Sequence, residues 1–191
     1  MGMIRIGIVI LAAAWGFAIS AQAAIGLELR TWPAATECRE CMTIQFEELE
    51  MRLPVAMMGR LFSFADAAGL HFLPPGGPRR ALLLFATSRE KVIGKYSAIG
   101  QATGARQFFD KLGSDERYME AWKAEGVERA ARYTRASNGK LHVYWIEAAP
   151  GDTQYVQIVI DGGDKIYTLA GDVTPQWYEA VLSNLRIARI P

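Results

Sequence analysis

Three apolar runs in the last third of the chain constrain the fold more than any other feature of the sequence. They are rich in β-branched and aromatic residues and span residues 140–148, 154–161 and 165–170. Short turn sequences containing Pro-Gly and Gly-Gly separate them, as expected for consecutive strands of an antiparallel meander. Asn138-Gly139 precedes the first run and predicts a hairpin to one further strand at 129–136.

A helix is predicted directly after this meander. Thr174 is a suitable N-cap residue and Pro175 suits the first helical position. The helix would present one apolar face, made by Trp177, Tyr178, Val181, Leu182 and Leu185. Because the strands are apolar on both faces, other elements must cover both sides of the sheet. We therefore expect an α+β fold in a single domain, with a central, mainly antiparallel sheet covered by helices on its faces.

The middle of the chain is predicted to alternate between short strands and helices. Residues 43–53 favour one bulged strand or two short strands, and residues 54–58 favour a single helical turn that ends at Gly59. Further strands are expected at 70–73 and 80–87, the second buried on both faces. Helices are expected at 88–99, at 106–112 and from Ser114, as N-cap, to Gly126.

The first 23 residues have the pattern of an export signal. A short segment with one positive charge, Arg5, precedes an apolar run, and Ala21-Gln22-Ala23 supplies small residues before a cut at Ala24. We expect residues 1–23 to be removed and residues 24–191 to form the mature periplasmic or secreted domain. The alternative is an uncleaved anchor, since the apolar run approaches the roughly 20 residues that span a bilayer.

The charge balance argues against binding to nucleic acid. Removing the leader takes away one of 21 basic residues, which leaves 20 against 20 acidic residues. A neutral surface of mixed sign lacks the basic stripe that neutralises phosphates, and it does not favour an anionic membrane. We expect neither partner after the leader has been cleaved.

Cys38 and Cys41 are the only cysteines of the chain. In an oxidising compartment such a pair is expected to form a disulfide. A thiol-disulfide redox site is the alternative, but its attacking cysteine normally begins a helix, whereas a β-like run follows Cys41. Metal binding is disfavoured because no second pair of cysteines or histidines is near in the sequence.

Signatures of enzyme chemistry are absent from the sequence. It has two histidines, His71 and His142, and no Walker loop, G-x-S-x-G, H-E-x-x-H or dinucleotide motif. His142 fits a structural role within a strand. Residues 161–164, Asp-Gly-Gly-Asp, fit a hairpin turn better than a calcium loop, which needs about six oxygens. The carboxylates Glu47, Glu48 and Glu50 fit a solvated strand, with Glu48 and Glu50 on one face. No metal or cofactor is expected.

The C-terminal part of the chain resembles a known family. The segment 164–171 (DKIYTLAG) at the end of the meander, followed by a final helix that closes on 181–186 (VLSNLR), is similar to the tail of the PsbP-like family. The resemblance covers about residues 140–187. It implies an antiparallel sheet flanked by helices and a binding or accessory role; it does not extend to the cysteine pair.

These observations favour a non-enzymatic exported protein that binds another exported protein. An accessory factor, or an inhibitor or immunity-type protein directed against a secreted toxin or hydrolase, would fit. A redox protein using Cys38 and Cys41, and a hydrolase with dispersed catalytic residues, are the alternatives. The predicted contact surface is the irregular segment around a Pro-Gly turn, with His71, Phe72, Arg79 and Arg80 as contact residues.

Overall fold

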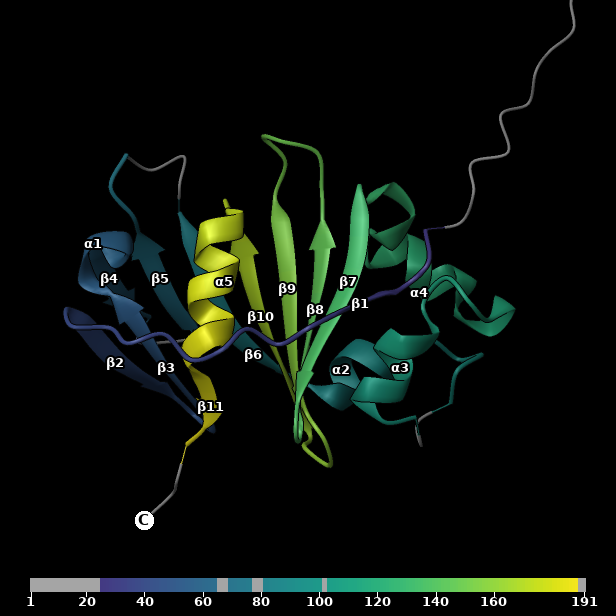
Figure 1. Ribbon diagram of the computed structural model, residues 1–191. Coiled ribbons are helices and arrows are strands. Elements are labelled where there is room, and N and C mark those ends of the chain that lie inside the picture. The colour runs from purple at the N-terminus through teal and green to yellow at the C-terminus, as the bar shows by residue number, and fades with distance from the viewer. Residues whose placement is uncertain (1–24, 65–68, 77–80, 101–102, 189–191) are drawn as a thin grey trace, which may run out of the picture.

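The computed structural model, which describes residues 25–64, 69–76, 81–100 and 103–188, is built on a central eight-stranded sheet (Figure 1). In spatial order its strands are β1 (Glu28–Arg30), β7 (Arg132–Asn138), β8 (Leu141–Glu147), β9 (Gln154–Ile160), β10 (Lys165–Gly171), β6 (Leu82–Ser88), β5 (Gly69–Leu73) and β4 (Arg60–Ser63). All neighbouring strands are antiparallel except β1, which runs parallel to β7. The predicted leader, residues 1–23, lies outside the described residues.

Two layers cover this sheet. On one face lie a three-stranded sheet of β11 (Leu185–Ile187), β3 (Leu49–Pro54) and β2 (Cys41–Phe46), and the long helix α5 (Pro175–Asn184). The other face packs against α2 (Arg89–Ile93), α3 (Ala105–Lys111), α4 (Met119–Ala124) and the 3-10 turns η2 (Glu116–Tyr118) and η3 (Val127–Arg129). A single turn of helix, α1 (Val55–Met58), joins β3 to β4. Both faces thus carry a covering layer over at least the strands β7–β10, and the predicted α+β fold is confirmed.

The meander predicted from the three apolar runs is confirmed, together with the helix after it. Strands β7, β8, β9 and β10 are consecutive antiparallel neighbours. In α5, Thr174 caps the helix by accepting a hydrogen bond of 3.2 Å from the backbone N–H of Trp177, and Pro175 occupies the first turn. At the β7–β8 hairpin the positive φ of 58° falls on Gly139, which is the first of the two turn residues between the paired Asn138 and Leu141.

Alternating residues of the central strands supply two separate cores. Val143, Trp145 and Ile158 face α5 and the small sheet, where Trp177, Val181 and Leu182 meet them in one buried cluster. Their sequence neighbours face the short helices in a second cluster, to which the sheet contributes Tyr133, Tyr144, Ile146, Val159 and Ile166. The near-continuous apolar character of these strands therefore reflects burial on both faces.

The middle of the chain departs from its prediction in several details. Residues 43–53, for which one bulged strand or two short strands were expected, form two strands, β2 and β3. The chain turns between them at Glu47, which has a φ of 51°. The helix expected at 88–99 ends at Ile93, because Gly94 follows, and residues 94–99 continue as turns. Asp115, instead of Ser114, caps the next helical segment by accepting from the N–H of Arg117.

Strand β6 corrects a further expectation that matters for function. It was predicted to be buried on both faces, yet only Leu82 and Leu84, which face the small sheet, are fully buried. Leu83, Phe85 and Thr87 point to the other side and are half-buried. The short helices gather over β7–β10, as Figure 1 shows at the right of the molecule, and none of the described helices packs on β4, β5 and most of β6 on that side. We call this uncovered part of the sheet the open face.

Candidate functional site

The open face ends at β4, an edge strand whose four residues are all exposed. Cross-strand pairing places Phe62 opposite His71 and His71 opposite Leu83, so that these three side chains share one side of the sheet. The side chain of Phe64, just after β4, stacks on the His71 ring with centroids 6.0 Å apart. Phe62 and Phe64 are 45% and 48% exposed. Two aromatic rings and a histidine therefore form an exposed cluster at the free edge of the large sheet.

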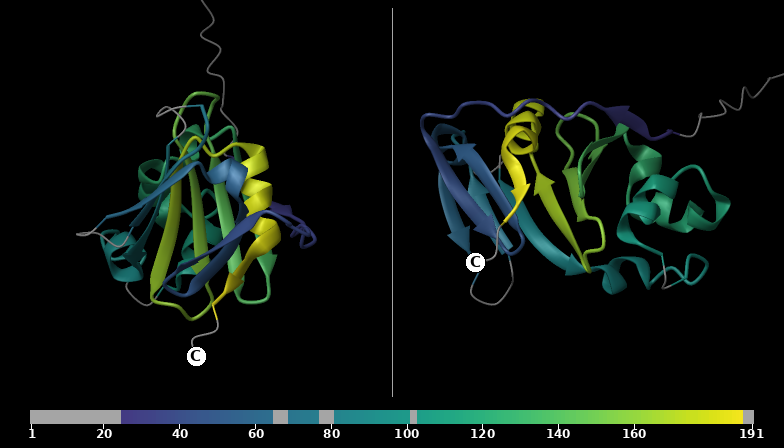
Figure 2. Two further views of the ribbon diagram at one scale, coloured as in Figure 1. Left: turned by 90° about the vertical axis from the view of Figure 1, so that its left-hand side faces the viewer. Right: turned by 60° about the horizontal axis from the view of Figure 1, so that its bottom comes forward.

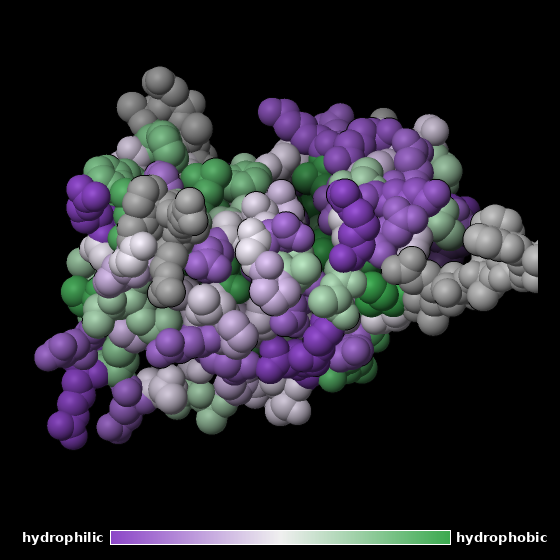
Figure 3. Space-filling model, turned by 90° about the horizontal axis from the view of Figure 1, so that it is seen from above, coloured by the Kyte–Doolittle hydropathy of each residue, from purple (hydrophilic) through white to green (hydrophobic). Residues whose placement is uncertain are grey.

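The exposed apolar cluster belongs to one end of the molecule. Leu61, Phe62 and Phe64 are exposed there, and Val55 of α1 is 48% exposed nearby in the chain. Figure 3, which views the molecule from above, shows several hydrophobic patches at the upper left, towards the end of Figure 1 where α1 and β4 lie, beside hydrophilic side chains at the lower left of the same end. Apolar clustering of this kind marks a contact site more often than scattered single residues do.

The structure treats the four predicted contact residues differently. His71 lies in the exposed cluster and is half-buried beneath Phe62 and Phe64. The prediction that Phe72 is a contact residue is wrong, because its side chain points to the opposite side of β5 and is fully buried. Its ring centroid lies 5.6 Å from that of Trp177. Arg79 and Arg80 lie outside the described residues. Phe62 and Phe64 were not predicted as contact residues. Their spacing of two residues, between Gly59 and Gly69, indicates that both side chains lie on the same side of a strand.

The cysteine pair forms the predicted disulfide, Cys38–Cys41. Cys41 begins strand β2, so the helix N-terminus that would activate a redox cysteine is not present at this site. The bridged loop is tied to the next elements by the N–H of Val55, which donates to the carbonyl of Glu40 at 3.0 Å, and by Arg52, which donates to the carbonyl of Cys38. These contacts favour a structural disulfide that closes the end of the β2–β3 hairpin.

The three carboxylates considered for acid-base chemistry are engaged in holding the small sheet. Glu47 and Glu48 lie in the β2–β3 turn and not in a strand, which corrects the expectation that Glu48 shares a strand face with Glu50. Glu47 pairs with Lys165 at 3.0 Å, and Glu48 accepts a hydrogen bond from the hydroxyl of Tyr167. Glu50 pairs with Arg186 of β11. Each contact joins the hairpin to a distant part of the chain.

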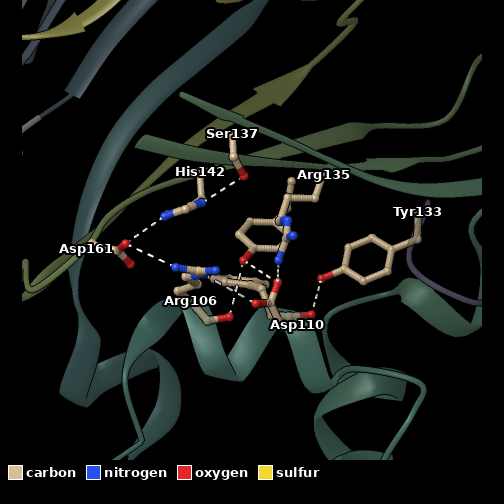
Figure 4. A network of polar contacts seen from close by, with 9 residues as sticks. Arg106, Asp110, Tyr133, Arg135, Ser137, His142 and Asp161 are labelled. Atoms are coloured by element: carbon tan, nitrogen blue, oxygen red, sulfur yellow. Dashed lines mark hydrogen bonds and ion pairs between the residues drawn. The ribbon is translucent and has the colours of Figure 1, made fainter. Parts of the chain in front are cut away.

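A polar network surrounds His142 (Figure 4). Ser137 and His142 are cross-strand partners of β7 and β8, and the Ser137 hydroxyl lies 2.9 Å from Nδ1 of the ring. The other ring nitrogen, Nε2, lies 2.9 Å from a carboxylate oxygen of Asp161 at the end of β9. Arg106 of α3 reaches the same oxygen at 3.3 Å. The His142 ring is 3% exposed, whereas Arg106 and Asp161 lie at the surface, so the contacts tie β7, β8, β9 and α3 together from the interior outwards.

The network continues along α3 towards Asp110. Arg135 of β7 pairs with the Asp110 carboxylate at 2.5 Å, and the Tyr144 hydroxyl donates to the same oxygen at 2.7 Å. Burial raises the pKa of the Tyr144 hydroxyl, and its hydrogen bond to Asp110 raises it further. Burial also acts to raise the pKa of the Asp161 carboxyl, but the contacts with His142 and Arg106 outweigh it and hold that pKa below its ordinary value. The charged form of Asp161 is therefore stabilised in the fold.

Ser137, His142 and Asp161 have the residue types of a hydrolytic triad, in which a serine hydroxyl passes its proton to a histidine held by a carboxylate. The surroundings do not complete such a site. A hollow of about 310 Å³ is lined on the Asp161 and Arg106 side of the network, and Ser137 is not among its lining residues. Asp161 is moreover shared with Arg106. The geometry thus supports a structural network more strongly than the hydrolase alternative.

The segment 161–164 forms the predicted turn between β9 and β10, with a φ of 80° at Gly162. Asp161 is already engaged with His142 and Arg106, and the carbonyl of Asp164 accepts from the N–H of Arg89 at 2.7 Å. Within the described parts of the chain, no three acidic, histidine or cysteine side chains converge in a way that could hold a metal ion. None of the helices described there is long and apolar enough to cross a membrane.

Comparison with known proteins does not assign a family. No protein-family model matches the chain, and no curated protein matches it. Among solved structures, a protein of Bacteroides thetaiotaomicron aligns over 78% of this chain with 10% identity and a TM-score of 0.36, and the alignment covers 48% of that protein's length. A GTP-binding regulator of Thermotoga maritima aligns over 78% of this chain and 80% of its own, with 9% identity and a TM-score of 0.28. Similarity this low assigns neither a function nor a ligand.

Proposed function

We propose that the protein is an exported, non-enzymatic binding protein whose partner is another exported protein, and that the partner docks at the β4 edge of the open face. One observation carries the proposal: Phe62 in β4 and Phe64 just after it are about half exposed beside His71, and among the described strands β4 pairs only with β5.

An exposed apolar edge strand of this kind promotes aggregation in a protein that has no binding partner. Its free N–H and C=O groups accept any extended chain, and natural proteins block such edges with charges, bulges or covering elements. The opposite edge of the sheet illustrates the protection. Strand β1 has only three residues, and Glu28 on it pairs with Arg132 at 3.1 Å. The β4 edge presents three large apolar side chains, Leu61, Phe62 and Phe64, where β1 presents one, Leu29, and this clustering favours its use as a contact surface.

The physical mode that fits is addition of a partner strand. An extended segment of the partner would pair with the backbone of β4, while Phe62 and Phe64 anchor alternate apolar side chains. Aromatic side chains are frequent anchors of protein interfaces because they bury a large apolar area. An accessory factor and an inhibitor of a secreted toxin or hydrolase would both use such a surface, and the identity of the partner distinguishes them.

The experiment is affinity capture from a periplasmic extract, followed by mass spectrometry of the proteins retained. The variant Phe62→Ser/Phe64→Ser is expected to weaken capture of the partner at least tenfold, about 1.4 kcal/mol. The matched control Leu29→Ser/Met119→Ser removes two exposed apolar side chains elsewhere and should retain the partner. Equal capture by the two double variants would exclude this edge, and turnover of a substrate by the purified protein would exclude the non-enzymatic role.

A further inference from the structure

A pocket of about 390 Å³ lies where the open face meets the short helices. Its floor is formed by β6, β9 and β10, and its rim by α2, the end of α4 and η3. A volume of this size is within the range of small-molecule sites in proteins, roughly 300–1,000 Å³. It is separate from the β4 edge, because neither Phe62 nor Phe64 lines it.

The rim of the pocket carries more positive than negative charge. Lys91, Lys95 and Arg129 line it, and Glu125 is the single carboxylate among its lining residues. Glu125 is already engaged, because it pairs with Lys95 at 3.0 Å and accepts a hydrogen bond of 2.7 Å from the hydroxyl of Tyr96. In the described part of the chain, no carboxylate pairs with Lys91 or Arg129. Two cations at the rim therefore have no carboxylate partner among the described residues.

The floor of the pocket presents a hydrogen-bond donor. Gln157 of β9 is 6% exposed, and its side-chain oxygen accepts a hydrogen bond of 2.7 Å from the hydroxyl of Thr168 on the neighbouring strand. Its amide nitrogen is left without an acceptor among the described residues, although both side chains line the pocket. This amide N–H group can therefore donate to an acceptor that enters the pocket.

Apolar groups form the remaining wall. Phe85 of β6 and Val92 of α2 are half-buried, and Tyr155 of β9 is 40% exposed at the mouth. The pocket thus combines two cations at its rim, one amide donor at its floor and aromatic surface between them. We propose that it binds a small organic anion, a carboxylate with a flat apolar body, whose carboxylate lies between Lys91 and Arg129 and whose ring packs on Phe85 and Tyr155.

Nuclear magnetic resonance can test this site directly, because the side-chain NH₂ group of Gln157 gives its own pair of signals in an amide correlation spectrum. Benzoate is the probe, and benzyl alcohol is the neutral probe of matched shape. Benzoate is expected to shift the Gln157 side-chain signals and the backbone signals of residues 91–95 with one saturable Kd. Benzyl alcohol should bind at least fivefold more weakly. Absence of a saturable benzoate shift at these positions overturns the proposal.

Two double variants make the charge argument specific. Lys91→Ala/Arg129→Ala should raise the Kd for benzoate at least tenfold, whereas Lys111→Ala/Lys123→Ala, which removes two cations outside the pocket, should change it less than twofold. An unchanged Kd in the first variant, or an equal rise in both, overturns the proposal. Phe62→Ser/Phe64→Ser should leave benzoate binding unchanged, so that failure of this site and failure of the protein-binding edge are seen separately.

Discussion

The ring of Tyr178 in α5 stacks on the ring of Trp145 in β8, with centroids 4.4 Å apart. The guanidinium group of Arg30 in β1 lies over the Tyr178 ring, 5.3 Å from its centroid. Arg30 also pairs with the Glu179 carboxylate at 2.7 Å. Helix α5 is thus held from the sheet below it and from the β1 segment beside it. Figure 2 shows that segment crossing α5 and the sheet. The helix is an integral layer of the fold and not a peripheral addition.

Leu182 of α5 provides the test of this packing, because it is 1% exposed within the core between the two sheets. We expect Leu182→Ala to lower the free energy of unfolding by about 2–5 kcal/mol, through lost burial and the cavity left behind. Urea denaturation followed by circular dichroism measures the change. Gln176→Ala, on the exposed side of the same helix, should cost under about 0.5 kcal/mol. A similarly small loss for Leu182→Ala would mean that the core re-forms without this side chain.

The disulfide is expected to contribute modestly to stability. Its closed loop is very short, and the loop-entropy relation then gives only about 1–2 kcal/mol. Cys38→Ser should therefore lower the melting temperature without preventing folding. Alkylation of protein taken from the periplasm should label neither cysteine before reduction. Rapid labelling of Cys38 and Cys41 in that fraction would contradict a structural disulfide in an exported protein.

Local patterns in the sequence predicted the C-terminal half well. Alternation, Gly-containing turns and the Thr174 cap are determined by residues within a few positions of one another, so the meander and α5 were predicted with small errors at their ends. Sheet order is not local. The return of β6 to pair with β10, and the separation of β2 and β3 into their own sheet, depend on contacts far apart in the chain.

The candidate sites follow the same division. The orientation of Phe72 could not be predicted, because it depends on which side of β5 faces α5, and that follows from the sheet order. The pocket was missed for a related reason. Lys91, Arg129 and Gln157 are far apart in sequence, and only the packing of α2 and η3 beside β9 brings them together.

Asp161 predicts a dependence of stability on pH. Its pKa is lowered in the fold, so its ionised form contributes stability above the unfolded pKa of about 3.9, and this contribution is lost as the pH falls through the lower folded value. Asp161→Asn should reduce the free energy of unfolding at pH 7, and its difference from wild type should shrink below about pH 4. Urea titrations across this range measure it. Asp152→Asn, in an exposed turn, is the control. A difference that grows on acidification would contradict the role assigned to Asp161.

The phenylalanines of neighbouring strands should behave in opposite ways. Phe72 is fully buried against Trp177, so Phe72→Ala should cost about 3–5 kcal/mol of stability, and any loss of partner binding would follow from unfolding. Phe62 is 45% exposed, so Phe62→Ala should change stability by under about 1 kcal/mol while it weakens binding of the partner. Thermal denaturation and affinity capture on the same preparations separate the two effects. If Phe62→Ala unfolds the protein, the exposed cluster is part of the core architecture, and the contact surface must be sought elsewhere.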